Sequence, residues 1–313
     1  MGAKLFVPAA CAAATVAALC ALPDRALADP ARAWAVARDN LPAQAALVIG
    51  ADLTAITKSQ TFNQLLPLAF AKEPDARKLF ETIKTSCKID PMTAIHGMVY
   101  ATDADRKQGA VYLALGAGLD QAKLTSCLEQ VAKANGKDAK LTAKKVGAIT
   151  ELTVDAGKAY VSWIGADVLV IPSDLHDRAV LEKWIGQKGG LAKSPLAKIY
   201  PSANTKGAVW GASAVPKDLE PGVHMKSAYG ALTMSAGTLA LDLHTTLDSA
   251  KAATDAVAKA NTQLAQVAGA GQLPPAVKSM LQQVSIKSTG AEVAIKASVP
   301  ESEVLGLLSL FGP

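Results

Sequence analysis

The same succession of helix and strand signals occurs twice in this chain, and that repetition limits the folds open to it more than any other feature. Each time, a proline comes just before a predicted strand. A hairpin follows the strand, and an aspartate-capped helix follows the hairpin. Two more strands then lead to a helix that a proline opens. The paired signals are Leu41-Pro42 and Tyr200-Pro201, Asp120 and Asp248, and Ile171-Pro172 and Val299-Pro300. Because order, caps and prolines agree, the sequence predicts two tandem β-(α)-ββ-α-ββ-α pseudo-repeats.

The first repeat differs from the second by a helical insertion after its first strand. One inserted helix is predicted near Thr61 to Phe70, with an interruption at Pro67, and another begins at Pro74. The predicted organisation is a signal peptide at residues 1–28, a first α/β repeat with the insertion at 29–190, and a second α/β repeat at 191–313.

The predicted strands alternate between apolar and polar side chains. In the strand 238–247, Leu239, Leu241 and Leu243 point to one face while Asp242 and His244 point to the other. Such strands form largely antiparallel or mixed sheets, and the sequence predicts an α+β fold with helices packed on one face. The other strands are predicted at 45–49, 97–102, 110–115, 148–154 paired with 159–171, 208–212, 231–235, 284–288 and 292–297.

The first 28 residues have the three parts of a cleavable signal peptide. Lys4 precedes an uncharged stretch from Leu5 to Pro23, and a small-x-small cleavage site follows at Ala26-Leu27-Ala28. The alternative, an uncleaved membrane anchor, is disfavoured by helix-breaking prolines and two charges in this segment. We therefore expect an exported, soluble protein of the periplasm or the extracellular space.

The charge of the mature chain is mild. Removal of residues 1–28 leaves a net charge of +4, and the densest basic pair, Lys144-Lys145, has no aromatic neighbours for base stacking. Nucleic acid is therefore not an expected partner. No later stretch approaches the ~20 apolar residues of a membrane span, so no transmembrane anchor is predicted in the mature chain.

Two cysteines, Cys87 and Cys127, stay in the mature chain, because Cys11 and Cys20 leave with the signal peptide. An even number in an oxidising compartment favours a disulfide between Cys87 and Cys127. Two separately buried thiols are the alternative, because free cysteine packs as a small apolar residue.

Catalytic and metal-binding motifs are absent from the sequence. It contains no His-x-x-x-His zinc motif, nucleophile elbow, phosphate-binding loop or dinucleotide fingerprint, so we predict no catalytic residue, metal or cofactor. Three groups of residues are candidate functional sites, and each also has a structural interpretation. They are Asp174, His176 and Asp177 as helix caps, Asp242 and His244 as a solvated strand face, and Trp163, Trp184 and Trp210 as core residues.

Two segments resemble a known group of proteins. Cys87-Lys88-Ile89-Asp90-Pro91 before a strand, and Gly118-Leu119-Asp120 followed by Leu124 and Cys127, look like segments of uncharacterised exported bacterial proteins built from repeated α/β units. The resemblance implies a fold and a cysteine pair. It implies no activity.

Three functions remain open at this point. The favoured one is an exported, non-enzymatic binding or structural protein, whose partner would be an apolar ligand or a cell-envelope protein. A periplasmic carrier of an apolar small molecule or lipid is the first alternative, and a hydrolase assembled only in the fold is the second. A continuous apolar cavity of several hundred Å³ would favour the carrier, and a cleft with a buried histidine, an acid and a hydroxyl would favour the hydrolase.

Overall fold

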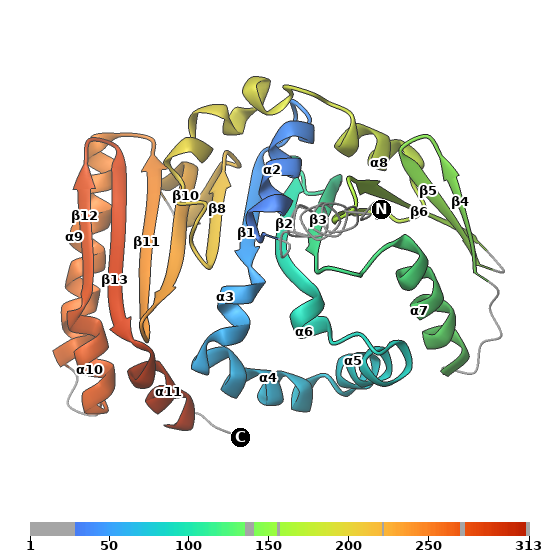
Figure 1. The fold of residues 1–313 in the computed structure, drawn as a ribbon. Coiled ribbons are helices and arrows are strands. Elements are labelled where there is room, and N and C mark those ends of the chain that lie inside the picture. The colour runs from blue at the N-terminus through green and yellow to red at the C-terminus, as the bar shows by residue number, and fades with distance from the viewer. Residues whose placement is uncertain (1–28, 135–140, 155–156, 221, 270–272, 311–313) are drawn as a thin grey trace, which may run out of the picture.

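A computed structural model describes residues 29–134, 141–154, 157–220, 222–269 and 273–310. Their strands form one 13-stranded sheet with antiparallel pairing throughout, flanked by helices (Figure 1). The chain is therefore an α+β protein with a large antiparallel sheet. The predicted signal peptide lies outside the described residues.

The first part of the chain holds the insertion predicted from the sequence. Its elements are α2 (Ala31–Asn40), β1 (Leu47–Asp52), α3 (Leu53–Lys58), α4 (Gln60–Lys72), α5 (Pro74–Cys87), α6 (Pro91–Ala94), β2 (Ile95–Thr102), β3 (Gly109–Leu115), α7 (Gln121–Ala134), β4 (Thr142–Val146), β5 (Ile149–Val154), β6 (Gly157–Ile164), β7 (Val168–Pro172) and α8 (Arg178–Ile185).

The second part has fewer helices between its strands. Its elements are the short 3₁₀ turns η1 (Leu191–Lys193), η2 (Pro195–Lys198) and η3 (Tyr200–Ser202), then β8 (Val209–Ser213), β9 (Lys217–Glu220), β10 (Val223–Ser235), β11 (Thr238–Leu247), α9 (Ala250–Gly269), α10 (Pro275–Gln282), β12 (Val284–Thr289), β13 (Glu292–Pro300) and α11 (Glu301–Leu310).

The sheet joins both parts of the chain without a break. Its strands follow the order β12-β13-β11-β10-β8-β1-β2-β3-β7-β6-β5-β4, and β9 pairs with β10 beside this path. At the centre β1 pairs antiparallel with β8, with Ile49 opposite Gly211 and Gly50 opposite Trp210. Residues on the two sides of position 190 therefore share one hydrogen-bonded ladder.

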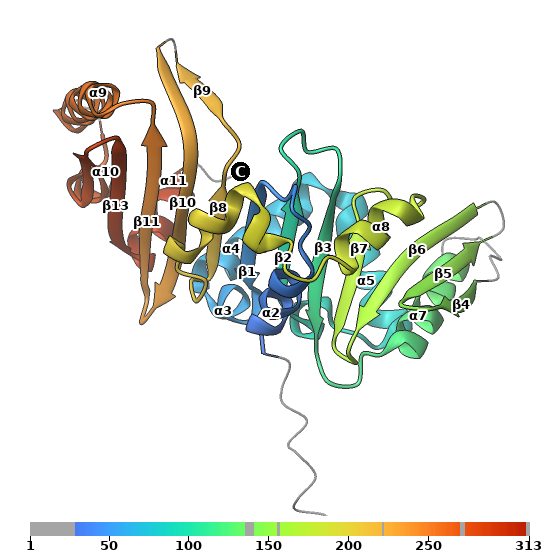
Figure 2. The same cartoon turned by 90° about the horizontal axis from the view of Figure 1, so that it is seen from above.

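Helices cover both faces of this sheet, so the prediction of helices on one face only was wrong (Figure 2). On the face we call the α2 face, Val48, Tyr112 and Trp210 pack in the main core with side chains of α2 and α8. On the opposite face, the α7 face, Leu113 packs near α7 and Ile295 packs near α9. The physical reason is that the central strands carry apolar residues at successive positions, so each face needs a cover.

The main core lies between the α2 face and helices α2 and α8. The predicted buried side of α8, formed by Val180, Leu181 and Trp184, is confirmed, and Trp184 has no exposed surface. The hydroxyl of Tyr112 donates to the carbonyl oxygen of Trp184, and burial raises the pKa of this phenol far above its ordinary value. The hydroxyl therefore acts as a neutral donor that links β3 to α8.

Several predicted boundaries differ from the structure. Pro67 lies within α4 instead of interrupting it, and the predicted strand 159–171 is two strands, β6 and β7, separated by a turn. Pro172 ends β7, and α8 begins only after Asp177. Ser249 instead of Asp248 caps the long helix, because the Ser249 hydroxyl accepts the Ala252 amide at 3.1 Å. Helix starts follow the residue whose side chain reaches the free amides, which proline positions alone do not reveal.

The predicted disulfide is present. Cys87 and Cys127 are bonded, with their Cα atoms 4.9 Å apart, within the usual range for a disulfide. Cys87 is the last residue of α5 and Cys127 lies in the middle of α7. The bond therefore fastens the inserted helix α5 to the helix between β3 and β4.

A buried carboxylate connects the last helix, α11, to the inserted helix α4. Glu301, at the start of α11, is almost completely buried, and its Oε1 accepts the backbone amide of Thr61 in α4 at 2.7 Å. This hydrogen bond holds the pKa of Glu301 below its ordinary value. Charge-assisted bonds of this kind satisfy the free amides at the start of a helix.

Replacing Glu301 with alanine should lower the free energy of unfolding by about 2 kcal/mol at pH 7, because the Thr61 amide loses a charged acceptor. A lowered folded pKa gives stability above the unfolded value of about 4.3, and this stability disappears as the pH falls through the folded pKa. Urea unfolding of wild type and Glu301→Ala at pH 7 and pH 3 should therefore show a difference that shrinks in acid. Ser302→Ala, at an exposed neighbour, is the control, and a pH-independent difference would contradict this account.

Candidate functional site

The first candidate site is an apolar cavity of about 460 Å³ between α7 and the α7 face of the sheet. Its volume falls within the range of about 300–1,000 Å³ that is typical of small-molecule sites. The lining comes from α7, from β5, β6 and β7, and from the segments that flank them. These residues are Gln121, Leu124, Thr125, Leu128, Leu141, Thr150, Leu152, Ala159, Val161, Trp163, Leu169, Ile171 and Leu175.

Local periodicity explains why these side chains meet. Gln121, Leu124, Thr125 and Leu128 recur at helical spacing and form one side of α7. Ala159, Val161 and Trp163 alternate along β6 and so point to a single face of the sheet. The cavity is the space between this helix stripe and this strand face.

The position of α7 keeps the cavity open. The main helical partner of α7 is α5, to which the disulfide ties it. In the second part of the chain, α9 lies directly on β11, β12 and β13, and its Ala253 is completely buried there. A helix that packs directly on the sheet, as α9 does, fills the space between helix and sheet. The helix α7 does not, and the space beneath it stays open.

The mouth of the cavity has exposed apolar side chains. Leu128 on α7 is 49% exposed and Leu175, after β7, is 43% exposed. The side chain of Gln121 also lines the cavity, and the Thr125 hydroxyl donates to the Gln121 carbonyl oxygen at 2.8 Å. Gln121, Thr125 and Thr150 are thus the polar residues of a mainly apolar wall.

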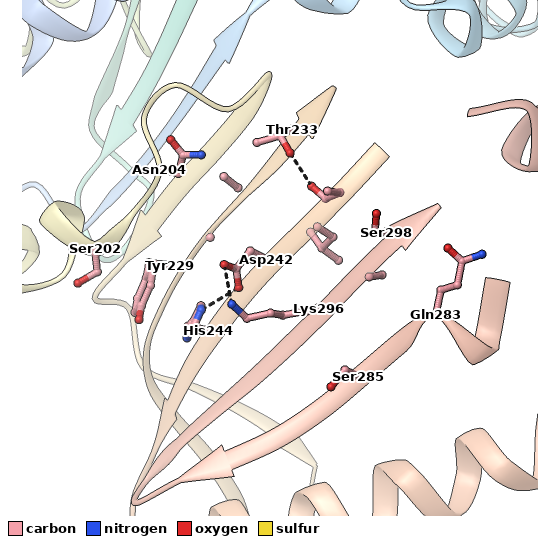
Figure 3. Close-up of a pocket in the computed structure, with 15 residues that line it drawn as sticks. Ser202, Asn204, Tyr229, Thr233, Asp242, His244, Gln283, Ser285, Lys296 and Ser298 are labelled. Carbon is pink, nitrogen blue, oxygen red and sulfur yellow. Dashed lines mark hydrogen bonds and ion pairs between the residues drawn. The ribbon is translucent and has the colours of Figure 1, made fainter. Parts of the chain in front are cut away.

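The second candidate site is a polar groove on the α2 face, over β10, β11 and β13 (Figure 3). His244 lines one end of the groove, and its two ring nitrogens each meet a carboxylate oxygen at 2.8 Å, one from Asp242 and one from Glu292. Tyr229 stacks on the imidazole with a centroid distance of 4.6 Å. Lys296 pairs with the other oxygen of Asp242 at 3.1 Å.

Both ring nitrogens of His244 already have a carboxylate neighbour, so neither is positioned to take a proton from a serine hydroxyl. The Tyr229 hydroxyl donates to Glu292 at 3.3 Å instead of facing the ring nitrogens.

The structure places the three groups of candidate residues named from the sequence in different surroundings. Asp177 caps α8 by accepting the amides of Ala179 and Val180, as predicted, whereas Asp174 accepts the amide of His176 in the turn before the helix and the His176 ring contacts the Lys158 carbonyl oxygen. Trp184 and Trp210 are core residues, but Trp163 lines the apolar cavity. No group of three or more His, Cys, Asp or Glu side chains within the described ranges is arranged to hold a metal ion.

Two partners of the Asp242–His244 pair are not apparent from local sequence. Glu292 and Lys296 lie on β13, which follows β11 only after two helices and another strand. Their alternation with Ala294 places them on one strand face, but only the register of β11 with β13 sets Lys296 opposite Asp242. Pairing the predicted strands in register is the signal that would have found them.

Comparisons with known proteins give distant structural likeness only. No family model and no curated protein matches the chain. Crystal form III of TP0453 is similar with a TM-score of 0.46 at 10% identity, covering 87% of this chain and 96% of that chain. Crystal form IV of TP0453 gives a TM-score of 0.44 at 11% identity, covering 89% and 99%. Among the helices that the structure describes, none is both long and apolar enough to cross a membrane.

Proposed function

We propose that this chain is an exported, non-enzymatic binding protein that carries an apolar small molecule, or the acyl chain of a lipid, in the cavity under α7. The observation that carries the proposal is the cavity itself. It has several hundred Å³ of space, and nine of its thirteen lining residues are aliphatic, one is tryptophan and three are polar. Empty apolar surface of this extent is costly in water, and an apolar ligand removes that cost.

The strand order of the second half of the chain supports the proposal that the first half holds a ligand site. Reading outward from the central pair, β1-β2-β3-β7-β6 has the same order as β8-β10-β11-β13-β12. In this correspondence α7 and α9 are equivalent helices, each between the third strand and the next hairpin. These orders support our proposal that the chain is a tandem repeat, in which one copy packs solidly and the other has become a ligand site.

The resemblance to exported proteins and the disulfide support the proposed location. A structural disulfide persists in an oxidising compartment, which agrees with export to the periplasm or the extracellular space. Both ring nitrogens of His244 contact a carboxylate, and this arrangement favours a binding protein over a hydrolase. The group of uncharacterised exported α/β-repeat proteins remains the proposed relationship.

Titration with N-phenyl-1-naphthylamine, a neutral fluorescent probe, tests the carrier proposal. We expect a fluorescence rise that saturates with an affinity in the micromolar range and is reversed by dodecanoic acid. Ala159→Phe places a ring inside the cavity from β6 and should weaken probe binding at least tenfold. Ala122→Phe adds the same group at an exposed position of α7 and should leave binding unchanged.

Native mass spectrometry of the protein purified from its own envelope complements this titration. A retained apolar molecule supports the carrier proposal. Saturable binding that Ala159→Phe leaves unchanged would place the probe elsewhere and refute the assigned cavity. Absence of saturable binding would leave a structural role as the better explanation.

A further inference from the structure

The polar groove is a second hollow with its own chemistry. It encloses about 450 Å³ and lies on the opposite face of the sheet from the apolar cavity, at the other end of the strand order. Its floor has the small side chains of Ala231 and Ala240, beside the backbone of Gly230 and Ala297, so little side-chain bulk covers this part of the sheet. The space above them is therefore open to a ligand.

The charged groups at the groove pair with one another. Asp242 receives both Lys296 and His244, and Glu292 receives His244 and Tyr229. An ionic ligand would have to displace one of these partners, which an uncharged ligand need not do.

The neutral polar groups of the groove remain available. Within the described part of the chain, the hydroxyls of Ser202, Ser285 and Ser298 and the carboxamide of Gln283 form no hydrogen bond. Asn204 uses its Oδ1 for the Lys206 amide, which leaves its NH₂ group free. Figure 3 shows that these groups lie on both sides of the floor, from the η3 side and from the β12 side.

We propose that the groove is a binding site for a neutral polyhydroxylated ligand, that is, a saccharide. Hydroxyl and carboxamide groups both donate and accept, and so do the hydroxyls of a sugar ring. The small-residue floor gives the C–H face of such a ring a surface to rest on, and the surrounding polar groups would satisfy its hydroxyls. An apolar ligand would instead strip water from these groups without replacing their hydrogen bonds. This site is independent of the apolar cavity.

Saturation-transfer-difference NMR on the purified protein tests the site. The neutral probes are maltotriose and N,N′,N″-triacetylchitotriose, and inorganic phosphate and citrate, followed by chemical-shift perturbation of the protein, are the anionic probes. We expect saturable transfer from at least one trisaccharide with an affinity in the millimolar range, and no comparable binding of the anions. Ala240→Phe fills the floor and should abolish the signal. Gln283→Ala should weaken binding about fivefold, the equivalent of one hydrogen bond.

The matched control is Gln263→Ala, which removes the same carboxamide from an exposed position of α9 and should not change binding. If Ala240→Phe does not fold by circular dichroism, Gln283→Ala, at the half-buried end of α10, decides the question. No saturable transfer from either trisaccharide at concentrations up to about 10 mM would overturn the proposal. So would binding that neither variant weakens, or anion binding as tight as that of the sugars.

Discussion

Replacing Cys127 with alanine is expected to lower the free energy of unfolding by about 4 kcal/mol, because the Cys87–Cys127 bond closes a loop of 40 residues in the unfolded chain. The same change should weaken binding of the apolar probe. Cys127 and Leu124 belong to one cluster on α7, and Leu124 lines the cavity. Without the bond, α7 loses its covalent attachment to α5 and can settle toward the sheet as α9 does.

Three measurements check this prediction together. Guanidinium unfolding gives the stability change, probe titration gives the affinity change, and alkylation without reductant counts free thiols. Cys87→Ala should have an effect of the same size, and the double variant should add little, because the disulfide can be lost only once. Two free thiols in the wild-type protein would contradict the prediction. Unchanged probe binding in both variants would refute the coupling between the bond and the cavity.

Replacing Gly50 with valine is expected to destabilise the protein by about 3 kcal/mol or more, at the junction of the two halves. Gly50 lies on β1 opposite Trp210 of β8, and a Cβ atom there would overlap the indole ring. Trp210 has little freedom to move, because it is buried and Trp34 packs edge-on against it with a centroid distance of 4.7 Å. The added side chain must therefore disturb β1, β8 or α2.

Ala51→Val is the matched control for this change. Ala51 is the next residue of β1 and points to the α7 face, where it is only half-buried. We expect thermal unfolding to show a large drop in melting temperature for Gly50→Val and a small change for Ala51→Val. Combining Gly50→Val with Trp210→Ala should cost less than the sum of the two single effects. Equal effects of both valines would contradict the packing argument.

Local patterns in the sequence were enough to predict many elements. Alternation in 238–247 placed Asp242 and His244 on one strand face, and the structure brings them within 2.8 Å. The apolar stripe Val180, Leu181 and Trp184 is the buried side of α8. These features depend on neighbours two to four residues away, whose relative direction follows from helix and strand geometry.

Features built from distant segments were predicted less well. Two helices and a second strand separate Glu292 and Lys296 from their partners on β11. The prediction of helices on one face failed because the pattern of the solvated strand β11 was extended to central strands such as β3, which is apolar on both faces. The strands β4 and β9 and the helices α3, α6 and α10 were not predicted.

The sequence by itself determined the α+β class, the alternating strand faces and, from two cysteines and a predicted export signal, the expected disulfide. The tertiary structure alone decided where space remains. The apolar cavity exists because α7 is fastened to α5 instead of resting on the sheet, and the polar groove exists because the small side chains of Ala231 and Ala240 lie on the same face of neighbouring strands. Cavities depend on the distance between a helix and the sheet and on the register of the strands. Residues far apart in the sequence set both.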